Sequence, residues 1–512
     1  MDERTPVLIG AGQFTYRGDP AVSPSPTTLL KIAAERAAID AGLGAEALSR
    51  ADAVAVAGYS IDAAGSKQGT IPHSSNPPAQ LSAMLGAAPR WAVYSEMGGN
   101  TPQYMINVLA ERIARGETEV ALAVGCEFLG STMKRLGKGL PFDDWAAVED
   151  ESPDPPARIG DPRPGNSPYE ARYGLNRPIN VYPLFENALR ARDGRSIADH
   201  QARLGRLFSR FTEVAAGNPE AWFPIRRTPE DLVTVTEKNR MIGFPYPKLL
   251  NAIMEVDQSA AVILASVKAA RELGVPEDRW VHLHGCADAN DLWHVLERRD
   301  FHSSPAMRLT GRRALEMAGV GLDRIDHIDL YSCFPVAVEV GAEELGLSLD
   351  DPRGFTVTGG LPYMGGPGNN YPMHSVATMM GLLRAKPGTY GLVTANGWYL
   401  TKQSTGIYST TPPSRPFERQ DPAVIQREID AMPHPEVIEA PEGRAVVETY
   451  TVVHKREGPF LGIVVGRDAS GRRFAAHTPS DPATLMGMEA QEQVGRTGTV
   501  GQKEGRNLFI PD

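Results

Sequence analysis

The chain has 512 residues but only three cysteines, Cys126, Cys286 and Cys333, and these lie far apart. Three widely spaced cysteines cannot form the disulfide framework of a small secreted domain, so a reducing compartment is expected. The sequence also lacks a signal peptide and any run of about twenty apolar residues, the length that spans a membrane. We therefore expect a cytoplasmic protein without a membrane span.

Basic residues are also in deficit. The chain has 52 Lys and Arg against 62 Asp and Glu, which gives a formal net charge of -10 and a pI near 5.7. Nucleic acid and anionic membranes both require a basic face, so neither is expected as the main partner. The composition, with 42% hydrophobic and 22% charged residues, is that of a globular protein of several domains. A small molecule is therefore the expected partner.

An internal repeat is the strongest architectural signal. One predicted helix ends at Gly42 before the apolar strand 53–57, and another ends at Gly319 before the strand 325–330. Glycine after the last helical turn is typical of a C-cap. In each copy a glycine-rich turn then begins a second helix, which leads to a further strand. In the first copy the turn is 98–99 and the strand 119–125, and in the second copy the turn is 365–367 and the strand 390–395. The pattern predicts two βαβαβ halves in a layered α/β fold.

The first glycine-rich turn predicts a binding site. Gly98 and Gly99 precede Asn100, Thr101 and Pro102, which can cap and start a helix. The first turn of a helix carries unpaired N–H groups, which suit an anion or an acyl oxygen. Gly98 and Gly99 are therefore candidates for an oxyanion pocket.

This segment resembles the nucleophile hairpin of thiolases. Thiolases carry their acylated cysteine on the first turn of a buried helix, which is followed by a strand ending in Gly-Gly-Glu. Here the strand ends in Gly125-Cys126-Glu127, and the family spacing counted back from Gly116 places the nucleophile at residue 99, which is glycine. Segment 241–264 resembles the sterol-carrier branch of the family. The resemblance implies a thiolase fold with duplicated halves in α/β/α/β/α layers.

The resemblance extends over nearly the whole chain and implies five regions. In thiolases the insertion between the halves, the loop domain, covers the active site and holds coenzyme A. The predicted regions are a thiolase N-terminal half 1–135, a loop domain 136–245, a C-terminal half 246–411, a proline-rich linker 412–443 and a C-terminal domain 444–512.

Three of these regions carry further local signals. The loop domain begins with an acidic, proline-rich stretch, 142–168, that is expected to be an exposed loop, and continues with a predicted helix 198–215. Seven prolines between Pro412 and Pro441 indicate a surface linker rather than packed structure. Short strands beyond it predict a small antiparallel barrel, which resembles the OB-like additional C-terminal domain of thiolase-like proteins of type 1. That segment lacks a dense basic and aromatic surface, so nucleic acid is not expected there.

The other catalytic stations of thiolases are changed as well. Gly366 stands where the family has the activating histidine of its Gly-His-Pro loop, and Ala395 and Asn396 stand where it has the second, acid/base cysteine. Acyl transfer requires a nucleophile with a base nearby, and proton abstraction requires a second base. We therefore expect neither Claisen condensation nor thiolysis. Cys126 and Cys333 are expected to be inert core thiols.

Tyr331 and His374 are the remaining catalytic candidates. Tyr331 occupies the oxyanion station, where a phenol can donate a hydrogen bond to a thioester oxygen or act as an acid or base. In having tyrosine at this position, the chain resembles the thiolase-like aldolases of steroid side-chain breakdown, although Ser332 stands where those enzymes usually have aspartate. His374 follows the changed Gly-His-Pro loop and faces either the pocket or a neighbouring helix.

His282, His284 and Cys286 share one face of a predicted strand, as converging zinc ligands would. The sequence signals no fourth ligand, so no metal and no resident cofactor are expected.

Together these features favour a thiolase-like, acetyl-CoA acetyltransferase-related protein of lipid metabolism that binds coenzyme A or an acyl-CoA. Two alternatives stay open: retro-aldol cleavage of a β-hydroxyacyl-CoA using Tyr331, and residual acyltransfer with displaced residues. The sequence is compatible with a monomer or a homodimer.

Overall fold

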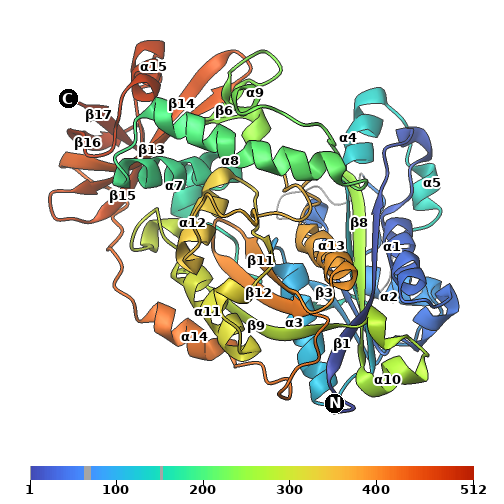
Figure 1. Ribbon diagram of the computed structural model, residues 1–512. Coiled ribbons are helices and arrows are strands. Elements are labelled where there is room, and N and C mark those ends of the chain that lie inside the picture. Colours follow the sequence, from blue (N-terminus) through green and yellow to red (C-terminus); the bar gives the residue numbers. More distant parts are fainter. Residues whose placement is uncertain (1, 63–70, 150–153) are drawn as a thin grey trace.

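The computed structural model describes residues 2–62, 71–149 and 154–512 (Figure 1). Its centre is a ten-stranded mixed sheet built from two halves, which are joined where Val7 and Leu8 of β1 pair with His282 and Val281 of β9. The strand order is β5 (Ala157–Ile159), β3 (Trp91–Ser95), β2 (Ala53–Val56), β4 (Val120–Phe128), β8 (Asp257–Ser266), β1 (Pro6–Thr15), β9 (Val281–Asn290), β12 (Lys402–Ser409), β11 (Tyr390–Gly397) and β10 (His327–Asp329).

The helices form three layers around the two half-sheets. Helices α3 (Thr101–Ala114) and α13 (Tyr371–Ala385) lie in the middle and share one apolar cluster with strands of both halves. On the outside, α1 (Pro26–Asp40) and α2 (Pro77–Met84) cover the first half, and α11 (Pro305–Ala318) and α12 (Pro335–Leu345) cover the second. This is the predicted α/β/α/β/α arrangement.

The predicted glycine stops are confirmed. Gly42 follows α1 with φ 78°, and Gly319 caps α11 with φ 67°. Both lie in the left-handed region, which glycine adopts without a steric penalty from Cβ. The short helix α10 (Val267–Glu272) connects β8 to β9.

The region between the halves is mostly helical. It contains α4 (Leu129–Lys138), α5 (Asp143–Ala146), α6 (Pro168–Arg172), α7 (Pro178–Arg192), α8 (Ile197–Gly217), α9 (Pro229–Val233) and the short strands β6 (Met241–Gly243) and β7 (Tyr246–Pro247). Helix α8 confirms the prediction for 198–215, and its apolar face of Leu204, Leu207 and Phe208 is buried.

The prediction of an exposed loop over 142–168 was wrong in two places. Trp145 of α5 is buried, and its indole N–H donates to the carbonyl of Ser23 at 2.9 Å. Strand β5 pairs in parallel with β3 and so occupies the outer edge of the first half-sheet. Residues 150–153 of this stretch lie outside the described residues.

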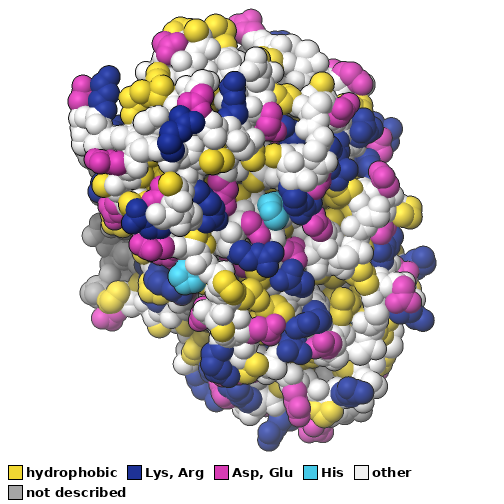
Figure 2. Space-filling view, turned by 90° about the vertical axis from the view of Figure 1, so that its left-hand side faces the viewer, with side chains coloured by type: hydrophobic (Ala, Val, Ile, Leu, Met, Phe, Trp, Pro, Cys, Tyr) yellow, Lys and Arg dark blue, Asp and Glu magenta, His cyan; other side chains and the backbone are white. Residues whose placement is uncertain are grey.

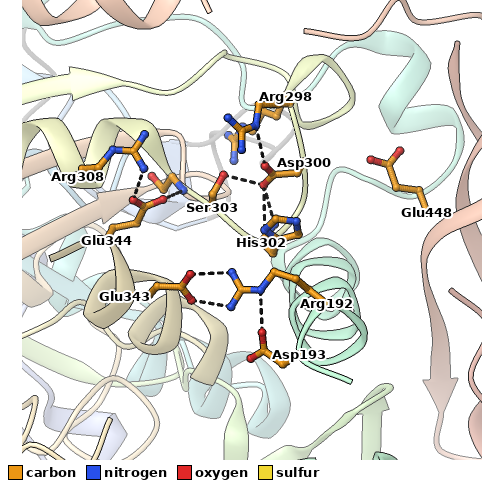
Figure 3. A network of polar contacts seen from close by, with 12 residues as sticks. Arg192, Asp193, Arg298, Asp300, His302, Ser303, Arg308, Glu343, Glu344 and Glu448 are labelled. Carbon is orange, nitrogen blue, oxygen red and sulfur yellow. Dashed lines mark hydrogen bonds and ion pairs between the residues drawn. The ribbon is translucent and has the colours of Figure 1, made fainter. Parts of the chain in front are cut away.

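Charged contacts attach the loop domain to the second half (Figure 3). Arg192 at the end of α7 binds both carboxylate oxygens of Glu343 on α12 at 2.7 and 2.8 Å. Deeper in this interface, His200 Nε2 lies 2.6 Å from Glu186 Oε1, and Arg203 Nε donates to Glu339 Oε1 at 2.9 Å. The helices α7, α8 and α12 are therefore held together by polar groups as well as by apolar packing.

The C-terminal region forms a small closed barrel, as predicted. Its strands are β13 (Gly443–Lys455), β14 (Gly458–Asp468), β15 (Arg473–His477), β16 (Thr497–Lys503) and β17 (Arg506–Pro511), and α15 (Pro482–Ala490) is inserted between β15 and β16. The barrel closes because β13 pairs with both β14 and β16, while β15 and β17 pair in parallel and so depart from the predicted antiparallel arrangement. Figure 2 shows basic and acidic side chains interspersed on the face that includes the left side of Figure 1.

The proline-rich segment 412–443 differs from the expected linker. It contains α14 (Pro422–Asp430), whose Ile425 and Ile429 are buried against α11 and β9. The spacing of these two apolar residues, one turn apart on a helix, was the sequence signal for this packing. No helix in the described ranges is both long and apolar enough to cross a membrane.

Candidate functional site

The Tyr331 side chain fills the space beside Gly99, the position predicted for the nucleophile. A Cβ built on Gly99 would lie 2.2 Å from the Tyr331 hydroxyl oxygen and 2.6 Å from the carbonyl oxygen of Asn396, whereas real Cβ atoms essentially never approach closer than 3.0 Å. The Tyr331 ring packs edge-on against the Tyr371 ring, with centroids 5.6 Å apart, and the Tyr331 backbone N–H donates to Thr394 Oγ1 at 3.1 Å. Position 99 therefore accepts no side chain while Tyr331 stands in this place.

The environment of Tyr331 keeps its phenol protonated. The side chain is only 7% exposed, and burial raises its pKa well above the usual value of 10.0; Cys333 and Tyr371 raise it further. A protonated phenol donates a hydrogen bond but is a poor proton acceptor. Tyr331 is therefore suited to polarise a carbonyl rather than to abstract a proton.

The oxyanion candidates Gly98 and Gly99 lie at the start of α3, as predicted. The Gly98 N–H already donates to the Asn369 side-chain oxygen at 2.9 Å, and the Asn369 amide donates in turn to the carbonyl of Gly58 at 2.7 Å. A ligand oxygen would have to displace Asn369 to reach this N–H. Sequence reasoning missed Asn369, because the contact joins segments that are far apart in the chain.

Loop 365–367, predicted to replace the Gly-His-Pro loop, is tightly packed. Gly366 donates its N–H to the carbonyl of Ile253 at 2.8 Å. Gly365 has φ 114°, and a Cβ on it would lie 2.3 Å from Gln258 Oε1. The loop therefore requires glycine at 365 for both backbone conformation and space.

At Ala395 and Asn396, the position predicted for the second cysteine, an amide and a tyrosine are in contact. Ala395 is fully buried, and the Asn396 amide donates to the Tyr182 hydroxyl at 2.8 Å. The Tyr182 ring, from α7, stacks on Phe334 at 4.4 Å, so this network links the loop domain to the station. Tyr182 was not predicted, because nothing in its local sequence marks the contact.

The remaining thiols lie in surroundings that favour the protonated form. Burial raises the pKa of Cys333 to about 12 and that of Cys126 well above its usual value. Thiolates, not thiols, are the nucleophiles, so these positions favour packing over reaction.

His374 lies in α13 and faces β1. Its Nδ1 is 2.8 Å from Gln13 Oε1, and burial lowers its pKa to about 3. The side chain has no exposed surface. This contact gives His374 a structural role, and a catalytic role for it stays a prediction.

The residues considered for zinc do not form a ligand set in the described part of the chain. The rings of His282 and His284 are 6.2 Å apart, and His284 Nε2 lies 2.7 Å from the carbonyl of Thr411. The one group of metal-ligating side chains found among the described residues is Glu186, His200 and Glu339. There Arg195 Nε donates to His200 Nδ1 at 3.1 Å, which leaves Nε2 to carry the proton toward Glu186 and opposes metal binding.

Exposed apolar side chains lie beside loop 365–367. Phe223, Ile225 and Met254, which we call the apolar rim, are 36, 49 and 45% exposed. Phe223 donates its N–H to the carbonyl of Tyr363, and Ile253, beside Met254, accepts from the N–H of Gly366. The rim therefore borders loop 365–367.

Comparison with known proteins places the chain in a family. A solved structure from Mycobacterium smegmatis, described as a monomeric SCP2-thiolase-like protein of type 1, is 37% identical, with a TM-score of 0.84 over 100% of this chain and 99% of the other. The chain belongs to the SCP2-thiolase-like proteins of type 1. The family descriptions "Thiolase C-terminal domain-like" and "Thiolase-like protein type 1 additional C-terminal domain" match residues 287–394 and 424–505.

More distant relatives are enzymes. The acetyl-CoA acetyltransferase of Methanothermobacter thermautotrophicus is 31% identical over 134 residues, and acetyl-CoA acetyltransferase 1 of Arabidopsis thaliana is 30% identical over 142 residues. The matches cover 26 and 28% of this chain and about a third of each of these relatives. The Ltp2-ChsH2(DUF35) aldolase shares the fold, with 21% identity and a TM-score of 0.57 over 79% of this chain and 98% of the other.

Proposed function

We propose that this SCP2-thiolase-like protein binds coenzyme A or an acyl-CoA in lipid metabolism and catalyses neither Claisen condensation nor thiolysis. The observation that carries the second half of the proposal is the Tyr331 hydroxyl in the space of the nucleophile, 2.2 Å from a Cβ on Gly99. Substitution of the nucleophile alone would leave a cavity that a displaced group or water could use. Here the space itself is filled, so an acyl group cannot be attached at position 99.

The apolar rim and its basic neighbours support the first half of the proposal. Coenzyme A joins a largely uncharged pantetheine arm to phosphate groups, so its site needs apolar surface beside cations. Arg226 and Arg227 directly follow Ile225 of the rim, and Lys134 of α4 lies over the Trp222 ring at 5.4 Å. None of these three cations forms an ion pair with a residue in the described ranges. They are therefore free to bind phosphate.

Retro-aldol cleavage of a β-hydroxyacyl-CoA is the second candidate, and the placement of the Tyr331 phenol at the oxyanion station favours it. Cleavage also requires a base for the β-hydroxyl proton. The raised pKa of Tyr331 makes it unsuited to that task and better suited to donate a hydrogen bond to the thioester oxygen. The binding function therefore fits the geometry better than the aldolase does.

Calorimetric titration of the purified chain with coenzyme A, acetyl-CoA and a long-chain or steroidal acyl-CoA tests the proposal. We expect saturable binding of at least one of them, and no thiolysis of acetoacetyl-CoA when free coenzyme A is added. Absence of binding for all of them would refute the ligand, and thiolysis above the uncatalysed rate would refute the lost activity.

Two sets of variants sharpen the result. Arg226→Glu with Arg227→Glu should weaken coenzyme A binding, whereas Arg206→Glu, a reversal at an exposed position of α8, should leave it unchanged. If the protein cleaves a β-hydroxyacyl-CoA, Tyr331→Phe should abolish turnover and preserve affinity. A binder that performs no chemistry has no turnover to lose.

A further inference from the structure

A pocket of about 630 Å³ lies beside the N-terminus of α3, and Tyr331 is not among the residues that line it. Asn100 and Thr101 of the α3 start, Asp161 after β5 and Lys402 at the start of β12 line it, and α14 contributes Arg427. Its volume is within the range of small-molecule sites. This pocket exists because β5 and α14, two of the elements that the sequence did not predict, fold over this side of the sheet.

Lys402 is the one lysine in its wall, and it is held in an unusual way. The side chain is 4% exposed, and Nζ donates to the carbonyl oxygens of Met97 at 2.7 Å and Asp161 at 2.8 Å. Within the described chain no carboxylate forms an ion pair with Nζ, which lies 5.4 Å from the centroid of the Trp293 ring. A neutral amine has two N–H bonds and one lone pair, so the two carbonyls satisfy both N–H groups and leave the lone pair free.

The groups around Lys402 shift its pKa in opposite directions. Burial is the largest effect and lowers the pKa of Lys402 to about 8, and the Arg163 guanidinium lowers it further, whereas Asp161 and Glu96 raise it. Arg163 pairs with Asp161 at 2.6 Å and lies over the Trp293 ring at 3.8 Å, so much of the Asp161 charge is already neutralised. With this pKa about a tenth of the molecules carry a neutral Lys402 amine at pH 7, far more than for an exposed lysine.

We propose that this pocket binds a small carbonyl compound, an aldehyde or a ketone, and that Lys402 captures it as an imine. The nitrogen lone pair forms a C–N bond to the carbonyl carbon while the C=O π pair moves to oxygen, which takes up a proton. The resulting carbinolamine loses its hydroxyl as water, and the nitrogen loses its protons to give the neutral imine. The products are one imine and one water, with no change in oxidation state. Glu96 lines the same pocket and can accept and return the protons.

Reductive trapping tests this assignment on the unmodified protein. The chain is incubated with limiting propanal and sodium cyanoborohydride at pH 7, and the propylated lysines are located by peptide mass spectrometry. A pKa of about 8 in place of 10.5 leaves about 300 times more neutral amine at this pH. Because a lower pKa also weakens nucleophilicity, we expect labelling of Lys402 to exceed that of the exposed Lys238 and Lys386 by at least about tenfold.

The pH and two variants complete the test. Raising the pH to about 10.5 should remove most of the preference, since the exposed amines then become neutral as well. Lys386→Met should leave the labelling of Lys402 unchanged, and Lys402→Met should leave that of Lys386 unchanged. If Lys402 is labelled no faster than Lys386 at pH 7, the proposal is overturned and Lys402 only ties Met97 to Asp161. This result does not depend on coenzyme A binding at the apolar rim, so either proposal can fail without the other.

Discussion

A methyl group added at Gly99 should destabilise the protein strongly, because Tyr331 and Asn396 already occupy its space. In Gly99→Ala the new Cβ would require the Tyr331 hydroxyl to retreat from 2.2 to about 3.0 Å. The carbonyl of Asn396, at 2.6 Å, must retreat as well, although it belongs to β11, where Asn396 pairs with Gln403 of β12. Overpacking of this kind costs about 3 kcal/mol, at the upper end of the usual range.

A double-mutant cycle isolates the contact with the hydroxyl. Tyr331→Ala alone should be destabilising by about 3 to 5 kcal/mol because it leaves a cavity. In that background Gly99→Ala should cost about 1 to 2 kcal/mol less, since only the Asn396 carbonyl still opposes the methyl group. Gly137→Ala is the matched control, because Gly137 lies within α4 and nothing lies within 4 Å of a Cβ there. Helix propensity predicts that this control is neutral or stabilising by up to about 1 kcal/mol.

The assay is the melting temperature from scanning calorimetry, with all four members of the cycle measured in one buffer. The order should be Gly137→Ala at or above wild type, and Gly99→Ala clearly below it. A Gly99→Ala variant that melts with the wild type would refute the packing described for Tyr331. Equal losses in the two backgrounds would show that the Asn396 carbonyl alone opposes the methyl group.

Three further predictions concern titration, a buried histidine and assembly. Burial beside Glu186 raises the pKa of Glu339 from 4.5 to about 8, so the folded state keeps a proton that the unfolded state loses. The stability of the wild type should therefore fall as the pH rises between these values. Glu339→Gln should flatten that fall, which thermal melts at pH 6 and 9 measure. His374→Leu should lower the melting temperature, because Gln13 Oε1 loses its partner, but leave coenzyme A affinity unchanged; a selective loss of affinity would instead place His374 at the ligand. Strand β5 covers the outer edge of β3, so β3 is not free to pair with a second copy of the chain. Light scattering should therefore give the 55.3 kDa mass of a monomer, and a dimer mass would show that pairing uses another surface.

Much of the fold follows from local pattern. Apolar strands, glycine stops after α1 and α11, and two glycine-rich turns predicted the duplicated halves, and short strands with turns predicted the C-terminal barrel. These features are readable because each depends on hydrogen bonding and burial within a few neighbouring residues. The three failures, α5, β5 and α14, are short elements in acidic or proline-rich segments, where composition indicates loop and only packing against a partner element stabilises the structure.

The sequence, through its resemblance to thiolases, predicted that position 99 carries no nucleophile and that Gly366, Ala395 and Asn396 stand at the other reactive positions, because the identity of each residue is visible without a structure. Only the tertiary structure decided what fills the site. Three features bring together segments that are distant in the chain. The Tyr331 hydroxyl lies beside Gly99, Asn369 accepts from the Gly98 N–H, and Lys402 is buried. Such contacts depend on how the halves, the loop domain and α14 pack together, and no local pattern encodes that packing.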